Sequence, residues 1–274
     1  MYFFLKIYSF ILRLSPQFIV KFNEYFIYSL LFHFIKIRRE LVDKNLSIAF
    51  PTLSAKERYL ISKKCYKFFS KEMVDLIKGS FWKDTSMVKF ENIQELEKAL
   101  ELNKGVLLVG GHLGAFDKAF ASIKKKGHKI SGVAYEQNNK GSDRYFKNIR
   151  ENFFTKQLYR GDNLKEILHL LKKNEIVVLL SDQNARHKGI DVNFFGYPCS
   201  TFSGAAVLHK RTGSPILCFD IIKQNQEYWT SFKKINEENN MDIASVVQEY
   251  TFAIEESIKK DPSQYFWFHN RWRV

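Results

Sequence analysis

The chain has 274 residues, 45% of them hydrophobic, which is enough to bury a full core and excludes a disordered protein. Its 43 Lys and Arg outnumber 29 Asp and Glu, and the formal net charge of +14 favours an anionic partner: nucleic acid, acidic lipid or an acidic carrier protein. The 26 Phe residues exceed the few stacking platforms that a nucleic-acid module needs, which favours lipid.

The first 36 residues are strongly apolar but are interrupted by four charged residues, Lys6, Arg13, Lys21 and Glu24. The longest uninterrupted run, residues 25–35, is shorter than the roughly 18 to 20 residues that span a bilayer. We interpret residues 1–40 as a helical, membrane-associated segment in the cytoplasmic leaflet, with Lys36, Arg38 and Arg39 near the headgroups. No small-residue cleavage site follows, so a removable signal peptide is not expected. A tilted single span and a pair of buried core helices stay open as alternatives.

Residues 41–274 are expected to form one domain. Apolar positions recur at helical spacing over 54–78, and Ser54 followed by Glu57 is a capping-box signal for the start of that helix. Short β-rich runs follow at 106–110, 129–135, 156–159, 175–181 and 214–222. Helical stretches lie between them, near 114–126, 142–152, 163–173 and 202–212.

Two elements complete the predicted domain. Residues 227–234 are expected to add an edge strand, and residues 242–260 to close the chain as an amphipathic helix. The alternation of strands and helices predicts an α/β fold, a mostly parallel mixed sheet flanked by helices. The functional loops of such a sheet lie at the carboxyl ends of its strands.

A candidate catalytic pair follows the strand at 106–110. Gly110, Gly111 and His112 come where the buried strand stops and a helix begins. Asp117 lies five residues further on, so it can reach the imidazole only if His112 precedes the helix proper. A carboxylate behind an imidazole fixes its tautomer and stabilises the imidazolium that forms when a hydroxyl proton is removed. The pattern predicts His112 as general base and Asp117 as its partner, with a purely structural helix-cap histidine as the alternative.

A second group of polar residues follows the apolar strand at 175–181. Asp182 and Gln183 end that strand, so they are expected at the same sheet edge as His112. A polar turn without a role in binding explains the same residues.

Phe195 and Gly196 precede a turn at Pro198, after which Ser200, Thr201 and Ser203 are expected to open the next helix. Free backbone donors at a helix start can hold a phosphate or a thioester oxygen. A plain strand followed by a helix cap is the alternative.

Four segments resemble, in their order and approximate spacing, the lipid A late acyltransferase family, the lauroyl and myristoyl transferases of lipopolysaccharide assembly. They are GGHLGAFD at 110–117, SDQ at 181–183, VNFFGYPCS at 192–200 and QYFWFHNRW at 264–272. NLSIAFP at 45–51 resembles that family's N-terminal stretch, so the resemblance to this branch of the lysophospholipid acyltransferase-like superfamily covers nearly the whole chain. One position departs: the family usually carries Glu where this chain has Asp117, the form usual in glycerolipid acyltransferases.

The resemblance implies an enzyme that moves a fatty acyl group from acyl–acyl carrier protein to a hydroxyl of a lipid A precursor. It implies action at the cytoplasmic face of the inner membrane, without a metal or another cofactor. By resemblance, Asp182 and Gln183 help to build the pocket. Arg150 resembles the arginine beside the family's active site, where a guanidinium can clamp a glycolipid or carrier phosphate, and Arg160 is a second candidate.

Two other functions fit part of the sequence. A glycerolipid acyltransferase acting on a lysophospholipid is favoured by Asp117 alone. A basic protein that binds membrane or nucleic acid without catalysis is the non-enzymatic alternative, but no RNA-binding signature, zinc finger or helix-turn-helix supports nucleic acid.

The remaining features concern packing. Phe266, Trp267 and Trp272 with His269, Arg271 and Arg273 suit either a membrane interface or a packed C-terminal tail. The three cysteines form no CxxC pair, so each is expected to be buried packing in a reducing, cytosol-facing compartment; they are Cys65, Cys199 and Cys218.

Overall fold

The central sheet has seven strands in the computed structural model, which describes residues 1–79, 84–159, 164–236 and 241–272. The strand order is β1-β9-β8-β2-β5-β3-β4, and neighbours are parallel except in the β8–β9 hairpin. The strands are β1 (Val88–Phe90), β2 (Val106–Gly110), β3 (Ile130–Ala134), β4 (Lys156–Tyr159), β5 (Ile176–Leu180), β8 (Ile216–Gln224) and β9 (Glu227–Ile235).

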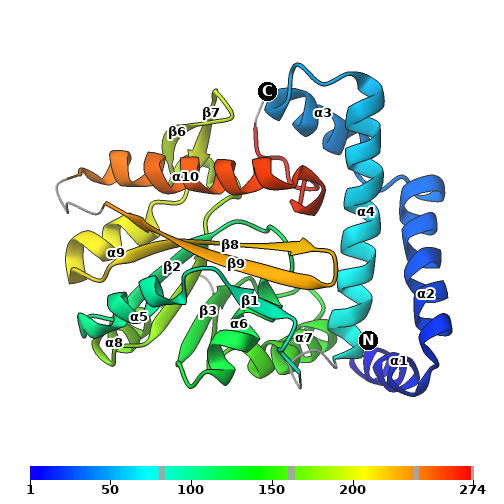
Figure 1. The fold of residues 1–274 in the computed structure, drawn as a ribbon, viewed down its shortest axis with the longest axis horizontal. Helices are drawn as coiled ribbons and strands as arrows, with labels where there is room; N and C mark the ends of the chain where they lie inside the picture. The colour runs from blue at the N-terminus through cyan, green and yellow to red at the C-terminus, as the bar shows by residue number, and fades with distance from the viewer. Residues whose placement is uncertain (80–83, 160–163, 237–240, 273–274) are drawn as a thin grey trace.

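Helices cover both faces of this sheet. One face carries α8 (Leu164–Lys172), α9 (Gly204–Thr212) and α10 (Ile243–Lys260), and the other carries α5 (Ile93–Glu101), α6 (Phe116–Lys125) and α7 (Lys140–Phe153). In Figure 1, α10 lies above the sheet and α6 and α7 lie below it. Because both faces are covered, the central strands are continuous apolar runs, and all of β2 is buried. The predicted α/β fold is confirmed.

Two local expectations differ from the structure. The strand at 227–234 is not at the edge, because β1 pairs with it in parallel, with Val88 opposite Tyr228. Ser200 and Thr201 do not open a helix: they end β7 (Tyr197–Thr201), which pairs with β6 (Ile190–Phe194) in a separate two-stranded sheet. Cross-strand pairing extends this segment, and α9 begins only after Ser203.

Among the described residues, five helical elements precede the sheet. They are α1 (Tyr2–Leu14), α2 (Gln17–Ser29), the π-helix η1 (Leu30–Phe34), α3 (Arg39–Ala49) and α4 (Ala55–Lys78). The capping box predicted at the start of α4 is present, since the Ser54 hydroxyl accepts from the Glu57 N–H and the Ser54 N–H donates to the Glu57 carboxylate. Figure 1 shows α4 at one end of the sheet, with α1 and α2 on its outer side.

The first two helices are two-sided. Leu12 and Val20 pack on Val74 and Ile77 of α4, whereas many other large apolar side chains of the two helices are exposed. We call this set the N-terminal apolar face; it comprises Phe3, Phe4, Ile7, Phe10, Ile11, Leu14, Phe18, Ile19, Phe22 and Phe26. Within the described ranges, no single helix has the length and apolar character to cross a bilayer, and only residues 17–34 taken with α3 reach that threshold, as a pair bent by 85°.

All three cysteines are buried and unpaired, as predicted. Burial raises the pKa of each thiol, to about 12 in Cys218. These thiols therefore act as small apolar side chains within the core.

Candidate active site

The register of two neighbouring strands places the candidate site. Strands β2 and β5 are parallel, with Gly110 opposite Leu180. His112 lies two residues beyond Gly110, and Asp182 lies two residues beyond Leu180. Because both side chains follow the carboxyl ends of adjacent parallel strands, they meet at one edge of the sheet.

One carboxylate holds both the ring and the backbone of the histidine. His112 Nδ1 lies 2.7 Å from Asp182 Oδ1, and the backbone N–H of His112 donates to Asp182 Oδ2 at 2.9 Å. An ionised carboxylate can only accept hydrogen bonds, so the neutral ring carries its proton on Nδ1. The lone pair of Nε2 is then available to accept a proton from a substrate.

The pair shifts the protonation equilibria of both side chains. Burial alone would lower the pKa of His112, but the charge and hydrogen bond of Asp182 outweigh burial and raise that pKa above 6.5. For Asp182 the effect of burial has the opposite sign and would raise the pKa, yet the interactions with His112 lower the pKa of Asp182 to about 2. Asp182 is therefore ionised at every pH near neutrality and supports the imidazolium form of His112.

The loop that carries His112 is fixed by a glycine and by the C-terminal segment. Gly114 has a φ of 62°, and a Cβ added there would lie 1.8 Å from the carbonyl oxygen of Ile221, so only glycine fits. The backbone N–H of Gly114 donates to the Gln264 carbonyl at 2.8 Å, and that of Phe266 donates to the His112 carbonyl at 3.0 Å. These bonds explain why segments 150 residues apart in the chain form one site.

Asp117 lies at the start of the helix after the His112 loop, as predicted, but it is not the carboxylate that is hydrogen-bonded to the ring. It lies half-buried in the first turn of α6, where burial raises its pKa to about 6. The neighbouring Lys118 lowers this pKa, while Glu72, which forms an ion pair with Lys118, raises it. Within the described ranges, the carboxylate hydrogen-bonded to His112 is that of Asp182, and no such bond joins His112 to Asp117. The catalytic role of Asp117 stays a prediction.

A cavity of about 260 Å³ brings three of the predicted residues together. His112, Arg150 and Gln183 all line it, and the rest of its wall is mainly apolar, with Phe154 and Val178 among the side chains. The Arg150 guanidinium donates to Gln157 Oε1 at 3.0 Å, which fixes its direction. A mostly apolar cavity with cationic and amide groups beside a histidine suits a fatty acyl chain that ends in a polar carbonyl.

Three of the predicted residues lie elsewhere or outside the described ranges. Phe195 and Gly196 form the β6–β7 turn with φ values of 53° and 77°. The Phe195 ring packs against Phe50 and Trp267, and its backbone N–H donates to Glu255 Oε2 at 2.6 Å. Neither residue lines the cavity that contains His112, so their role in substrate binding stays a prediction. Arg160 lies outside the described residues.

The C-terminal segment supplies supporting residues, and among them Tyr265 carried no signal of its own in the sequence. Tyr265 is buried against Asp182, and burial together with that carboxylate raises the pKa of Tyr265. Arg271 is buried and donates to the Ser200 carbonyl at 2.6 Å and to the Thr201 hydroxyl. Trp267 and Trp272 are also buried, which corresponds to the packed tail rather than to an interface. This segment follows the long helix α10, and its sequence gave no signal that the chain returns there to the loop that carries His112.

The described residues contain no group of three or more His, Cys, Asp or Glu side chains placed to hold a metal ion. Near His112, the backbone N–H of Asn184 donates to His269 Nε2 at 3.1 Å, so that ring nitrogen already has a partner.

Comparisons with known proteins give a consistent result. The profile of the bacterial lipid A biosynthesis acyltransferase family matches residues 1–274. The chain is 26% identical to the lipid A biosynthesis palmitoleoyltransferase of Escherichia coli K12 over 254 residues, which cover 88% of this chain and 80% of that protein. It is 23% identical over 256 residues to the lipid A biosynthesis acyltransferase of Haemophilus influenzae, with 89% and 81% covered. It is 21% identical over 250 residues to the E. coli lipid A biosynthesis lauroyltransferase, with 88% and 81% covered.

Proposed function

We propose that this chain, which belongs to the bacterial lipid A biosynthesis acyltransferase family, transfers a fatty acyl group from a thioester donor to a hydroxyl of a lipid A precursor. The observation that carries the proposal is the His112–Asp182 pair beside a largely apolar cavity, in a chain that matches the family over its whole length. The donor is acyl–acyl carrier protein. The acceptor is the 3-hydroxyl of an existing β-hydroxyacyl chain, so the product is an acyloxyacyl group.

His112 acts as the general base. Its Nε2 takes the proton of the acceptor hydroxyl as the hydroxyl oxygen attacks the thioester carbonyl carbon. The tetrahedral intermediate collapses by breaking the carbon–sulfur bond, and the leaving sulfur takes the proton back from the imidazolium. The products are an ester and a free thiol on the carrier, and no covalent enzyme intermediate is needed.

Two carboxylates support this base. Asp182 orients the ring through Nδ1 and stabilises the imidazolium, as its short hydrogen bond and low pKa support. Asp117 adds a second negative charge at the start of α6, the role that the H-x4-D/E pattern of the family implies. Burial raises its pKa only to about 6, so Asp117 is largely ionised above neutrality.

The cavity shared by His112, Arg150 and Gln183 receives the donor acyl chain. Its apolar walls suit the hydrocarbon, and the guanidinium of Arg150 is placed to attract the phosphate or carbonyl of the donor. The net charge of +14 supports recognition of an acidic carrier protein and of an anionic membrane.

The N-terminal apolar face holds the enzyme at the cytoplasmic surface of the inner membrane. The exposed apolar side chains of α1 and α2 stand close in sequence to Lys6, Arg13 and Lys21, a combination typical of helices that lie in the lipid interface. In this arrangement residues 1–40 are the membrane-associated segment, and residues 41–274 are the acyltransferase domain.

Mass spectrometry of lipid A and of phospholipids, from cells with and without the gene, tests the reaction. The proposal is supported if lipid A from cells that lack the gene has lost one secondary acyl chain. The second candidate, a glycerolipid acyltransferase, is favoured by Asp117 in the position where the lipid A relatives usually carry Glu. It predicts altered glycerolipids with unchanged lipid A.

A further inference from the structure

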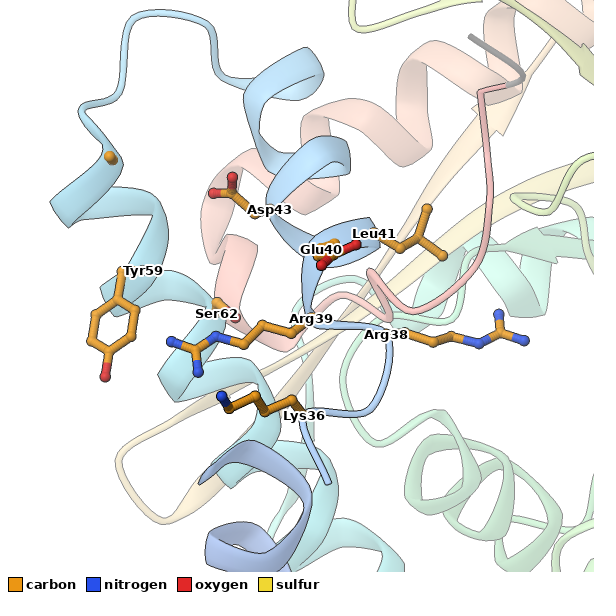
Figure 2. A pocket seen from close by; sticks show the side chains of 9 residues that line it. Lys36, Arg38, Arg39, Glu40, Leu41, Asp43, Tyr59 and Ser62 are labelled. Carbon is orange, nitrogen blue, oxygen red and sulfur yellow. The ribbon is translucent and has the colours of Figure 1, made fainter. Parts of the chain in front are cut away.

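A further cavity, of about 700 Å³, lies between the η1–α3 connection and the first turns of α4. Figure 2 shows Lys36 and Arg39 side by side, with their cationic ends directed toward the side of the cavity that Tyr59 and Ser62 form. This cavity does not include His112, and the reaction described above does not use it.

Aromatic rings orient Arg39 in this cavity. Its guanidinium carbon lies 4.6 Å from the ring centroid of Phe32 and 5.3 Å from that of Tyr59. Stacking on rings fixes the direction of a guanidinium but leaves its in-plane N–H donors unused. In the part of the chain that the structure describes, Arg39 has no hydrogen-bond acceptor. Its donors are therefore available to a ligand.

Ser62 provides an independent sign of a missing ligand. It lines the cavity with only 5% of its surface exposed, and its hydroxyl has no hydrogen-bond partner among the described residues. A buried hydroxyl without a partner costs free energy, so such groups are few in native proteins. The Ser62 hydroxyl is therefore an unsatisfied donor in the wall of the cavity.

The charges around the cavity favour an anion. Lys36 and Arg39 contribute two positive charges, against the carboxylates of Glu40 and Asp43, whereas Arg38 points away from them in Figure 2 and donates to the Phe268 carbonyl at 2.7 Å. Asp43 is already paired with Arg58, at 3.1 Å, which lies outside the cavity lining. Lys36 and Arg39 therefore face at most one uncompensated carboxylate, that of Glu40.

An apolar groove shares Arg38 with this cavity and extends toward the catalytic residues. Arg38 lines both the cavity and an adjoining groove of about 410 Å³, whose other side chains are mainly apolar and include Leu31 and Met73. At its far side the groove is lined by Phe266, whose ring centroid is 6.1 Å from that of His112. A basic site, an apolar groove and the catalytic histidine thus follow one another.

We propose that Lys36, Arg39 and Ser62 bind a phosphate of the acceptor lipid while one of its acyl chains lies in the adjoining groove. This inference rests on the proposed function and names the place where its acceptor binds. The cavity at Arg150 then holds the donor chain, so the two substrates approach His112 from separate cavities.

The test compares variants of the full-length enzyme in detergent micelles. One double variant is Lys36→Gln with Arg39→Gln, and its matched control is Lys56→Gln with Lys63→Gln, two exposed lysines of α4 that carry the same charge change outside the cavity. The acceptor is a phosphorylated lipid A precursor, used before and after phosphatase treatment. The cavity variant should raise the KM for the phosphorylated acceptor roughly tenfold or more, with kcat and the KM for the donor unchanged.

Ser62→Ala is the sharper variant because folding does not depend on its hydroxyl. The temperature of unfolding should stay the same or rise, since the change removes a buried group without a partner. The KM for the phosphorylated acceptor should nevertheless rise several-fold, and that for the dephosphorylated acceptor should not change.

Three outcomes overturn the proposal. An equal rise in KM for the matched control shows general electrostatic attraction to anionic micelles. A rise in the KM for the carrier-protein donor alone shows that the donor's phosphate occupies the cavity. An unchanged KM in every variant shows that no phosphate binds there.

The phosphate site can also be tested without catalysis. In His112→Ala protein, titration calorimetry with the phosphorylated lipid should show binding that weakens on Lys36→Gln and Arg39→Gln substitution. If the proposed reaction is wrong but the site is right, this binding persists while transfer is absent. If the site is wrong, transfer by the otherwise unaltered enzyme persists while binding is insensitive to these residues.

Discussion

His112 Nδ1 lies 2.7 Å from Asp182 Oδ1, although the two residues are 70 positions apart in the chain. The other oxygen of the same carboxylate accepts the backbone N–H of His112, so Asp182 fixes both the loop and the ring. It also raises the pKa of the imidazole against the effect of burial. Asp182 therefore sets two properties of the base: the direction of Nε2 and the pH at which Nε2 becomes free of its proton.

Asp182→Asn should change the pH profile as well as the rate. Catalysis needs neutral His112, so kcat/KM rises with pH through the pKa of His112. The substitution removes the interaction that raises this pKa and leaves burial, which lowers it, so the acidic limb should move to lower pH. The maximal rate should fall about 10²-fold or more, because the ring loses its orienting partner. An acidic limb at the wild-type pH would show that Asp182 does not act on the base.

Asp117 substitutions separate its role from that of Asp182. Asp117→Asn should lower turnover severely, and Asp117→Glu should retain measurable activity above it, because Glu keeps the negative charge that supports imidazolium. The acidic limb should move less in Asp117→Asn than in Asp182→Asn, since Asp182 is the carboxylate that is hydrogen-bonded to the ring and raises the pKa of His112. A role limited to the helix dipole instead gives near-normal turnover with a loss of about 0.3 to 1 kcal/mol in the free energy of unfolding.

Much of this site follows from the sequence, and its central contact does not. Apolar runs ending in polar residues predicted that His112 and Asp182 lie at one edge of the sheet. The sequence does not tell that β5 lies directly beside β2, because β3 and β4 come between them in the chain. Strand order depends on long-range packing that local periodicity does not encode. Proximity in the chain therefore predicts Asp117 as the partner of His112, whereas the folded protein places Asp182 there.

The other differences have the same origin. Ser200 and Thr201 carry the composition of a helix start, yet pairing across β6 and β7 extends them. Phe195 belongs to a cluster with Trp267, formed by a C-terminal segment that returns to the site after α10. Such returns join distant parts of the chain, so their contacts are visible only in the folded protein.

Salt should affect the two kinds of donor differently. Activity with acyl–acyl carrier protein should fall steeply as ionic strength rises, because an acidic carrier is attracted by a broad basic surface that salt screens. Activity with a small thioester should fall less. The measurement is kcat/KM for each donor across a series of salt concentrations. An equal dependence on salt for both donors would show that the basic surface does not attract the carrier protein.

The N-terminal apolar face should control membrane association. Deleting residues 1–36 would also remove Tyr28 and Phe32, which are part of the main core, so surface substitutions are the cleaner change. Phe10→Gln with Phe18→Gln should lower partitioning into vesicles about tenfold or more, because each exposed ring contributes apolar area to the interface. The control is Leu102→Gln with Phe252→Gln, which removes exposed apolar side chains elsewhere. Equal losses in the two double variants would show that the N-terminal face is not the binding surface.

The most direct test of His112 as the general base is the turnover of purified His112→Ala with acyl–acyl carrier protein and a lipid A precursor. General-base catalysis predicts a loss of at least roughly 10² to 10⁴ in kcat, with the temperature of unfolding and vesicle binding close to wild type. A folded His112→Ala protein that transfers acyl groups at the wild-type rate would contradict it.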